Sequence, residues 1–412
     1  MEDKLLDEVL ARVDALQDDM VRTQVDITAF PAISPKSGGE GEWDKAQYIE
    51  SLLDEVGFDE VLEYNAPDPD AKKECRPNLI ARVKGHNHDR TLWFMAHMDV
   101  VPPGDLKLWH TDPYKAVVKE GRIYGRGTED NQQDLVASIY AIKAIRDAGV
   151  TPPHDVGLVI VADEETGSKY GLCHVLGEYD FKREDLIVVP DYPTPDGSKI
   201  EVAEKSIAWL RFVTHGGQCH ASMPAKGNNA HRAAAHLLCE IDEMLHQRYG
   251  AKNELFDPPL STFEPTKKEA NVPNVNTIPG EDAFYFDCRI LPQYDINEIL
   301  SAIQEKAKGV ERRFDVSIAI EPVQFEQAAP PTPADAEVVN LLSEAVKKIY
   351  GVCTKTVGIG GGTVAAYFRR AGYNVAVWGK GDETEHGPDE YCVIDNMVGD
   401  AKVYATMALH PE

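Results

Sequence analysis

Short apolar segments alternate with helical ones in the first half of this chain, and few folds accommodate that order. Buried strands are predicted at 78–83, 91–96, 156–162 and 186–190. One helical segment is predicted over 3–29, a second helix at 43–57 and another at 135–148, where apolar residues recur at helical spacing. Strands that alternate with helices indicate an α/β fold whose sheet is largely parallel or mixed and is flanked by helices.

The pattern changes after the Pro- and Gly-containing turn at 193–197. Strands are predicted at 207–214, 284–291 and 316–325, and long helices at 228–248 and 296–308. This order fits an antiparallel sheet covered by helices. A proline-rich hinge at 328–334 then precedes a helix at 335–350 and a strand at 374–378, which return to the α/β pattern.

At 412 residues the chain exceeds the roughly 250–300 residues at which a single hydrophobic core usually stops growing. We therefore predict two domains. Residues 1–197 plus 327–412 would form the catalytic domain, and residues 198–326 would form a smaller inserted α+β domain.

The formal net charge of −27 excludes two classes of partner. A nucleic acid or an anionic membrane surface repels so acidic a protein, and the sequence contains no long Lys/Arg run. No apolar stretch approaches the ~18–20 residues that span a bilayer, and the acidic start does not resemble a signal peptide. The seven cysteines are scattered and contain no Cys-x-x-Cys pair, so we expect free thiols and a cytoplasmic protein.

Acidic residues and histidines follow the predicted strands. The candidates are His97 and Asp99 after 91–96, Asp130 in a Gly-rich segment, Glu164 and Glu165 after 156–162, Asp191 after 186–190, and His386 shortly after 374–378. In an open α/β sheet the carboxyl ends of the strands converge on one crevice. Imidazole nitrogens and carboxylate oxygens together suit zinc or a similar divalent ion.

The spacing within these segments suggests separate tasks. In an extended segment Asp99 points the same way as His97, so it can hold the imidazole from behind. Asp130 can bridge two metal ions with its two oxygens. Glu164 and Glu165 are adjacent and point in different directions, so one suits metal binding and the other suits proton abstraction from water.

Four segments together resemble one known family: 95–102 (MAHMDVVP), 124–131 (YGRGTEDN), 162–168 (ADEETGS) and 385–390 (EHGPDE). It comprises the co-catalytic zinc metallopeptidases, which include acetylornithine deacetylase, succinyl-diaminopimelate desuccinylase, aminoacylase, glutamate carboxypeptidase and bacterial dipeptidases. The resemblance covers almost the whole chain. It implies two Zn²⁺ per subunit, for which Co²⁺ or Mn²⁺ can substitute.

The resemblance also implies a role for each candidate residue. His97 and Asp191 would bind one zinc ion, Glu165 and His386 the other, and Asp130 would bridge them. Asp99 would support His97, and Glu164 would act as general base.

The inserted domain resembles the family's lid, which also dimerises, so a homodimer is expected. His220 matches a histidine that reaches the active site of a neighbouring subunit and stabilises the oxyanion. Asn276 and Arg289 match residues that bind the substrate carboxylate, which suits a planar guanidinium. Without the resemblance, His220 would be read as a buried lid histidine and Arg289 as a surface residue.

A glycine run at 358–363 contains Gly361, Gly362 and Thr363. It lacks the Gly-Lys-Ser/Thr ending of a phosphate-binding loop, so nucleotide binding is disfavoured. Its amides, at a predicted helix start, can instead bind a substrate carboxylate. Relatives commonly carry Asp shortly after this Gly-Thr, where this chain has Val364 followed by two alanines.

The sequence therefore predicts a dizinc hydrolase that cleaves an amide bond in a small amino-acid-derived substrate. Asp at position 191 favours a peptidase for short peptides, whereas relatives with Glu there tend to be N-acyl-amino-acid deacylases. A deacylase of the desuccinylase or acetylornithine deacetylase type is the alternative. A non-catalytic metal-binding scaffold is a more distant one, because every position for a ligand and for the base is filled.

Overall fold

The computed structural model describes residues 2–410, and these form two compact units. Unit 1 comprises Met1–Val202, Thr332–Thr356 and Tyr367–Glu412. Unit 2 comprises Ala203–Pro331 and Val357–Ala366. No helix among residues 2–410 combines the length and the apolar character needed to cross a membrane.

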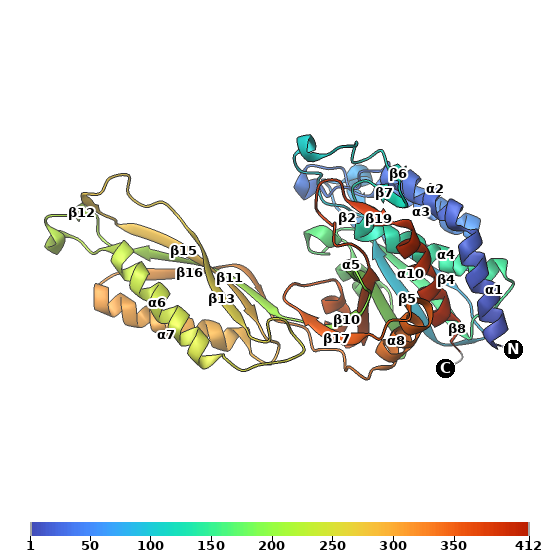
Figure 1. Cartoon of the computed structure of the whole chain (residues 1–412). Coiled ribbons are helices and arrows are strands. Elements are labelled where there is room, and N and C mark those ends of the chain that lie inside the picture. The colour runs from blue at the N-terminus through green and yellow to red at the C-terminus, as the bar shows by residue number, and fades with distance from the viewer. Residues whose placement is uncertain (1, 411–412) are drawn as a thin grey trace. The chain divides into compact units, whose positions relative to one another are not determined.

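Unit 1 is built on an eight-stranded mixed sheet (Figure 1). In spatial order its strands are β1 (Glu60–Glu63), β4 (Leu79–Val83), β8 (His154–Val161), β5 (Asn87–His97), β9 (Leu186–Thr194), β18 (Val375–Lys380), β10 (Lys199–Glu204) and β17 (Lys355–Ile359). The four central strands β8, β5, β9 and β18 are parallel, whereas β4 and β10 join them antiparallel. The carboxyl ends of the four parallel strands therefore share one edge of the sheet.

Helices flank this sheet. They are α1 (Glu2–Ala15), α2 (Gln17–Thr28), α3 (Trp43–Val56), α4 (Gln133–Asp147), α5 (Leu172–Glu178), α8 (Glu337–Tyr350) and α10 (Ile394–Ala408). The short helix α9 (Ala365–Arg370) crosses the division between the units, as do strands β10 and β17. Helix α4 packs on β5 and β8, α8 packs on β9 and β18, and α10 contacts both helices. Most side chains of the central strands are buried.

Short strands complete unit 1. A three-stranded ribbon contains β6 (Val117–Lys119), β7 (Arg122–Tyr124) and β19 (Tyr391–Val393), and β2 (Ala66–Pro67) pairs with β3 (Cys75–Arg76). The ribbon links two segments that are distant in the sequence, because Tyr391 lies opposite Tyr124.

Unit 2 contains a four-stranded antiparallel sheet in the order β13 (Thr262–Lys268), β15 (Glu281–Ile290), β11 (Ser206–His215) and β16 (Ser317–Glu326). Helices α6 (Ala230–Arg248) and α7 (Ile296–Phe314) pack beside each other on it (Figure 1). The core between the helices and the sheet includes Phe212, Phe284 and Ile303. A small pairing of β12 (Cys219–His220) with β14 (Thr277–Ile278) stands apart from this sheet.

The predicted fold class, a mixed α/β sheet flanked by helices with a smaller α+β part, is confirmed. Three local expectations were wrong. The N-terminal helical segment is divided at Leu16 into α1 and α2. Strand β13 was missed because Pro265 and its charged residues disguise it, yet proline is tolerated on an edge strand, where β13 lies. Residues 327–331 and 357–366, assigned by sequence to the catalytic domain, cluster with unit 2, and residues 198–202, assigned to the inserted domain, cluster with unit 1.

Candidate metal centre

The candidate ligands gather at the carboxyl edge of the parallel strands in unit 1. His97 is the last residue of β5, and Glu165 lies in a turn that follows β8. Asp191 lies inside β9, which continues to Thr194, and not after the strand as the sequence suggested. His386 lies in the loop between β18 and β19. Each of these side chains therefore lies in or after a different strand, near the carboxyl edge of the sheet, as expected for an α/β crevice.

Asp130 stands at the centre of this group. It lies just before helix α4, and its Oδ1 is 2.8 Å from His97 Nε2. Its Oδ2 is 3.1 Å from His386 Nε2. His97 Nε2 also lies 3.8 Å from Asp191 Oδ1, and His386 Nε2 lies 3.1 Å from Glu165 Oε1.

Two clusters of potential metal ligands follow from these distances. The first contains His97, Asp130 and Asp191, and the second contains Asp130, Glu165 and His386. Within each cluster the ligand atoms lie within 4.8 Å of one another. The two clusters share Asp130, which is the arrangement required of a carboxylate that bridges two ions.

Beside the shared carboxylate of Asp130, the protonated form of both histidines, His97 and His386, is favoured. Burial by itself lowers the pKa of His97, but the neighbouring acids, Asp130 foremost, outweigh it and raise that pKa well above its usual value. Hydrogen bonds to Asp130 and Glu165 raise the pKa of His386 to about 10. Burial works to raise the pKa of Asp130, yet the two histidines hold it well below its usual range.

For the remaining carboxylates of the centre, burial and neighbouring acids disfavour the negatively charged form. Burial and the neighbouring Asp130 raise the pKa of Asp191 to about 8, although His97 opposes the shift. Burial and Asp130 also raise the pKa of Glu165, and burial and Asp191 raise that of Glu164. A buried excess of carboxylates beside imidazole nitrogens is a donor set that divalent cations stabilise. The residues present therefore fit two divalent ions of the zinc type.

Asp99 contacts several of the segments that carry the candidate ligands. Its Oδ1 accepts a hydrogen bond from the backbone N–H of Glu164 at 3.0 Å, and its Oδ2 accepts one from Glu165 N–H at 3.1 Å. His97 Nδ1 lies 3.1 Å from the Asp99 backbone oxygen and 3.5 Å from its carboxylate. One buried acid thus contacts both a ligand ring and the turn that carries the two glutamates.

Two further acids hold the loops of the centre, and the sequence reasoning assigned them no role. Glu390 accepts hydrogen bonds from the amides of Glu129 and Asp130 at 3.0 and 3.1 Å, and from Arg126 at 2.6 Å. Glu129 accepts one from the Thr384 hydroxyl at 2.7 Å, in the loop that carries His386. The signal was present, because both acids lie within the segments 124–131 and 385–390 that carried the resemblance.

His220 and Asn276 belong to unit 2 and are neighbours there. The β12–β14 pairing places His220 opposite Thr277, and the amide of Ala221 donates to the Asn276 carbonyl at 2.9 Å. Both side chains are exposed, so His220 is not the buried lid histidine of the alternative interpretation. Its Nδ1 lies 2.8 Å from the Ser222 hydroxyl, a contact that orients the ring.

Arg289 and the glycine run also come together in unit 2. The guanidinium of Arg289 forms hydrogen bonds of 2.7 and 3.1 Å with Asp287 and donates to the Gly360 carbonyl at 3.1 Å. In the same loop Thr363 donates from its amide and its hydroxyl to Glu204, at 3.0 and 2.8 Å. The carboxylate that this loop binds in the structure is therefore the chain's own Glu204. Gly361 and Gly362 lie between these two anchored points.

Comparison with known proteins, like the geometry of the site, indicates a metallohydrolase. The chain is 40% identical to an uncharacterised metallohydrolase of Methanococcus maripaludis, over 95% of this chain and 98% of that protein. It is 28% identical to the succinyl-diaminopimelate desuccinylase of Sulfurovum sp., over 90% of this chain and 93% of the relative. Among solved structures, human carnosine dipeptidase 1 has the same fold, with a TM-score of 0.72, 18% identity and 98% of each chain covered.

The family assignment rests on most of the chain. The sequence profile of peptidase family M20/M25/M40 matches residues 93–410, which include every candidate ligand of the metal centre. The members of this family are metallohydrolases that act on amide or peptide bonds. The chain, with its shared-carboxylate metal centre at the strand ends of unit 1, belongs to peptidase family M20/M25/M40.

Proposed function

We propose that this protein is a dizinc amide hydrolase that cleaves short peptides. The observation that carries the proposal is the position of Asp130, whose two oxygens face His97 and His386 at 2.8 and 3.1 Å. A carboxylate in this position can serve two metal ions at once, and a pair of ions is a common device for amide hydrolysis.

His97, Asp130 and Asp191 would hold one zinc ion, and Asp130, Glu165 and His386 the other. When bound, the two ions would act as Lewis acids and would lower the pKa of a water molecule towards ~7. Co²⁺ or Mn²⁺ suits the same donors.

Glu164 would act as the general base and acid. Its backbone is fixed through Asp99, and its side chain makes no hydrogen bond among the contacts recorded for residues 2–410. Glu164 takes a proton from water as the water oxygen adds to the substrate carbonyl carbon. It then returns the proton to the nitrogen as the C–N bond breaks, which gives a carboxylic acid and an amine.

We further propose a homodimer in which His220 of one subunit serves the centre of its partner. Its exposure in unit 2 and the orientation of the ring by Ser222 support a role outside its own core. There it would donate a hydrogen bond to the oxygen that gains negative charge during attack. Asn276, its neighbour, and Arg289 with residues Gly361–Thr363 would bind the substrate carboxylate.

Two observations bear on the substrate. Asp at position 191 favours peptides, as in the peptidases that this chain resembles. The second candidate is an N-acyl-amino-acid substrate, which the similarity to the succinyl-diaminopimelate desuccinylase of Sulfurovum sp. favours. In both cases the scissile bond is an amide next to a carboxylate-bearing group, so the same centre can serve either.

A substrate panel tests the proposal. Zinc-loaded protein is assayed for amine release from dipeptides, tripeptides, N-acetylornithine and N-succinyl-diaminopimelate. We expect the highest kcat/KM with a dipeptide or a tripeptide. A higher kcat/KM for an N-acyl substrate would establish the second candidate. Metal-loaded protein that hydrolyses none of these amides would refute both.

A further inference from the structure

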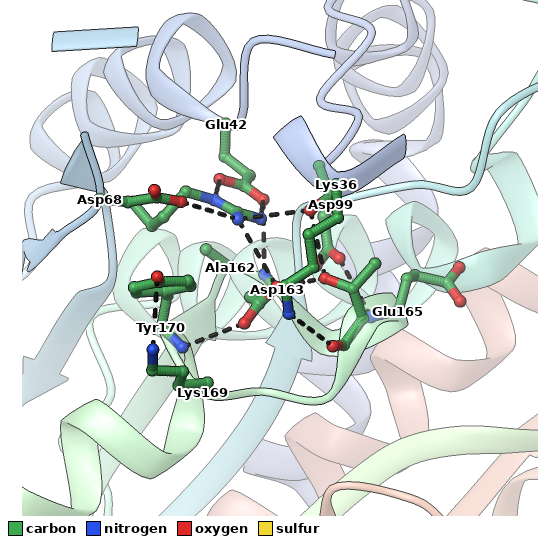
Figure 2. Close-up of polar contacts among 12 residues, drawn as sticks. Lys36, Glu42, Asp68, Asp99, Ala162, Asp163, Glu165, Lys169 and Tyr170 are labelled. Atoms are coloured by element: carbon green, nitrogen blue, oxygen red, sulfur yellow. Dashed lines mark hydrogen bonds and ion pairs between the residues drawn. The ribbon is translucent and has the colours of Figure 1, made fainter. Parts of the chain in front are cut away.

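A cluster of buried charged residues lies next to the turn that carries Glu164 and Glu165 (Figure 2). We call it the buried ion cluster. Its members, all between 0% and 6% exposed at the side chain, are Glu42, Asp68, Arg76 and Asp163. None belongs to the proposed ligand set, and charges are almost never buried without a partner.

Arg76 is the centre of this cluster. It lies in β3, and its guanidinium is paired in two places with Glu42, at the start of α3, with a distance of 2.6 Å from Nε to Oε2. Its Nη1 lies 3.5 Å from Asp68 and 3.5 Å from Asp163. One cation thus connects three acids from three separate parts of the chain, in a geometry that a forked guanidinium allows.

Asp163 connects this cation to the turn. Its side chain accepts a hydrogen bond from Tyr170 N–H at 3.0 Å and another from the Thr166 hydroxyl. Its backbone φ of +60° is the left-handed conformation, which a residue other than glycine adopts when its surroundings hold it there. The residue just before Glu164 is therefore fixed by the turn on one side and by Arg76 on the other.

Asp99 also holds the turn, through the amides of Glu164 and Glu165. Two carboxylates, those of Asp99 and Asp163, therefore form hydrogen bonds with the turn and the residues next to it (Figure 2). Lys45 is also buried nearby, where burial lowers its pKa to about 8, but its amine has no hydrogen-bond partner among residues 2–410. Of the charged side chains described here, Arg76 is therefore the cation that directly contacts Asp163.

We propose that Arg76 is a positioning residue which, through Asp163 and Glu42, sets the direction of Glu164 and Glu165. The proposal rests on the proposed function, because it gives these glutamates their tasks of proton transfer and metal binding. Lysine cannot replace Arg76, because a single ammonium group cannot contact Glu42 in two places and also reach Asp163. Removing a residue that supports a metal ligand or a catalytic base typically lowers activity or metal affinity 10–100-fold.

The test compares two buried arginines of unit 1. Arg369 is the matched control, because its guanidinium pairs with buried Glu201 at 2.9 and 3.0 Å, and it also donates to the carbonyl of Val375, the first residue of β18. This pair lies away from the carboxyl strand ends that form the centre. Arg76→Lys and Arg369→Lys are compared with the wild type for unfolding temperature, kcat, KM and zinc affinity by chelator competition.

We expect both variants to lose thermal stability. We expect Arg76→Lys alone to lower kcat 10–100-fold with KM within about twofold, and to weaken zinc binding by a similar factor. Equal zinc affinity and kcat in Arg76→Lys and wild type would overturn the inference. So would equal losses in the two variants, since those would reflect destabilisation alone.

A second variant covers the case in which Arg76→Lys does not fold. Asp163→Asn tolerates the left-handed backbone and weakens the contact with Arg76. It should reproduce the losses of kcat and zinc affinity, and unchanged values would also overturn the inference. Zinc affinity is measured without substrate, so it tests Arg76 even if the substrate panel refutes the proposed function.

Discussion

The carboxylate of Asp99 accepts the backbone N–H of Glu164 at 3.0 Å, across a sequence separation of 65 residues. This bond joins the loop after β5 to the turn after β8. The same carboxylate lies 3.5 Å from His97, so a ligand of one proposed zinc ion and the proposed base share a support. The positions of His97 and Glu164 therefore both depend on Asp99.

Asp99→Ala should disturb both zinc binding by His97 and proton transfer by Glu164. We expect kcat/KM to fall about 10–100-fold and zinc affinity to fall in parallel, because His97 loses the group behind it and two amides lose their acceptor. Steady-state kinetics and chelator competition measure these effects. Asp105→Ala is a suitable control, because Asp105 lies in the same loop region and its side chain accepts only the local amide of Lys107 in the recorded contacts. A change of less than twofold in Asp99→Ala would contradict the interpretation.

Glu164→Gln should separate catalysis from metal binding. We expect kcat to fall at least ~10²–10⁴-fold, because the amide cannot take the proton from water, whereas zinc content should remain close to two per chain. Metal analysis by mass spectrometry and turnover assays check the two halves of this statement. Retained turnover would eliminate Glu164 as the base.

The proposed role of His220 in a partner subunit can be tested by complementation. His220→Ala and Glu164→Gln homodimers should each be nearly inactive. Mixed and re-equilibrated, they should recover up to about a quarter of wild-type activity, because half of the dimers then contain one intact site. Activity that stays at the level of the separate variants would place His220 in its own subunit's site or outside catalysis.

Removal of metal should destabilise the protein as well as inactivate it. The buried carboxylates Asp191, Glu164 and Glu165, whose pKa values burial raises, lose their counter-charge without a cation. Bound zinc contributes about 4 kcal/mol per site when free zinc exceeds Kd a thousandfold. A chelator should therefore lower Tm by several degrees, and added Zn²⁺ should restore it. An unchanged Tm would show that no ion had been bound.

The buried Asp400, which is not one of the candidate metal ligands, predicts that the stability of the protein depends on pH. Burial raises its pKa to about 7, although hydrogen bonds from Tyr350 and Gln133, both 2.8 Å long, oppose the shift. In the unfolded chain the pKa of an aspartate is about 3.9, so the folded state binds the proton more tightly. The contribution of Asp400 to stability is full below about pH 4 and is lost as the pH rises towards 7.

Asp400→Asn removes this titration. Relative to the wild type, its free energy of unfolding should increase by about 2–4 kcal/mol between pH 4 and pH 8. Urea unfolding at constant zinc concentration measures both proteins at the two pH values. Parallel pH profiles for the variant and the wild type would show that folding does not raise the pKa of Asp400.

Several features could be predicted from local pattern because they depend on nearby residues alone. Apolar runs such as 156–162 predicted central strands, and β8 (His154–Val161) lies there. Edge elements were harder. Strand β13 has few apolar residues to bury, so its place in the sheet depends on pairing with β15, which no local pattern reveals.

The chemistry of the centre was determined by the sequence, since the strand ends carry the histidines and acids in an order that one sheet edge brings together. Tertiary structure decided what holds them. Arg76 and Glu42 look like ordinary surface residues in the sequence, and only the folded chain brings them together as a buried charge pair. The reason is physical: residue identity fixes which atoms can bind a metal or a proton, whereas burial and distance depend on segments that meet only in the folded chain.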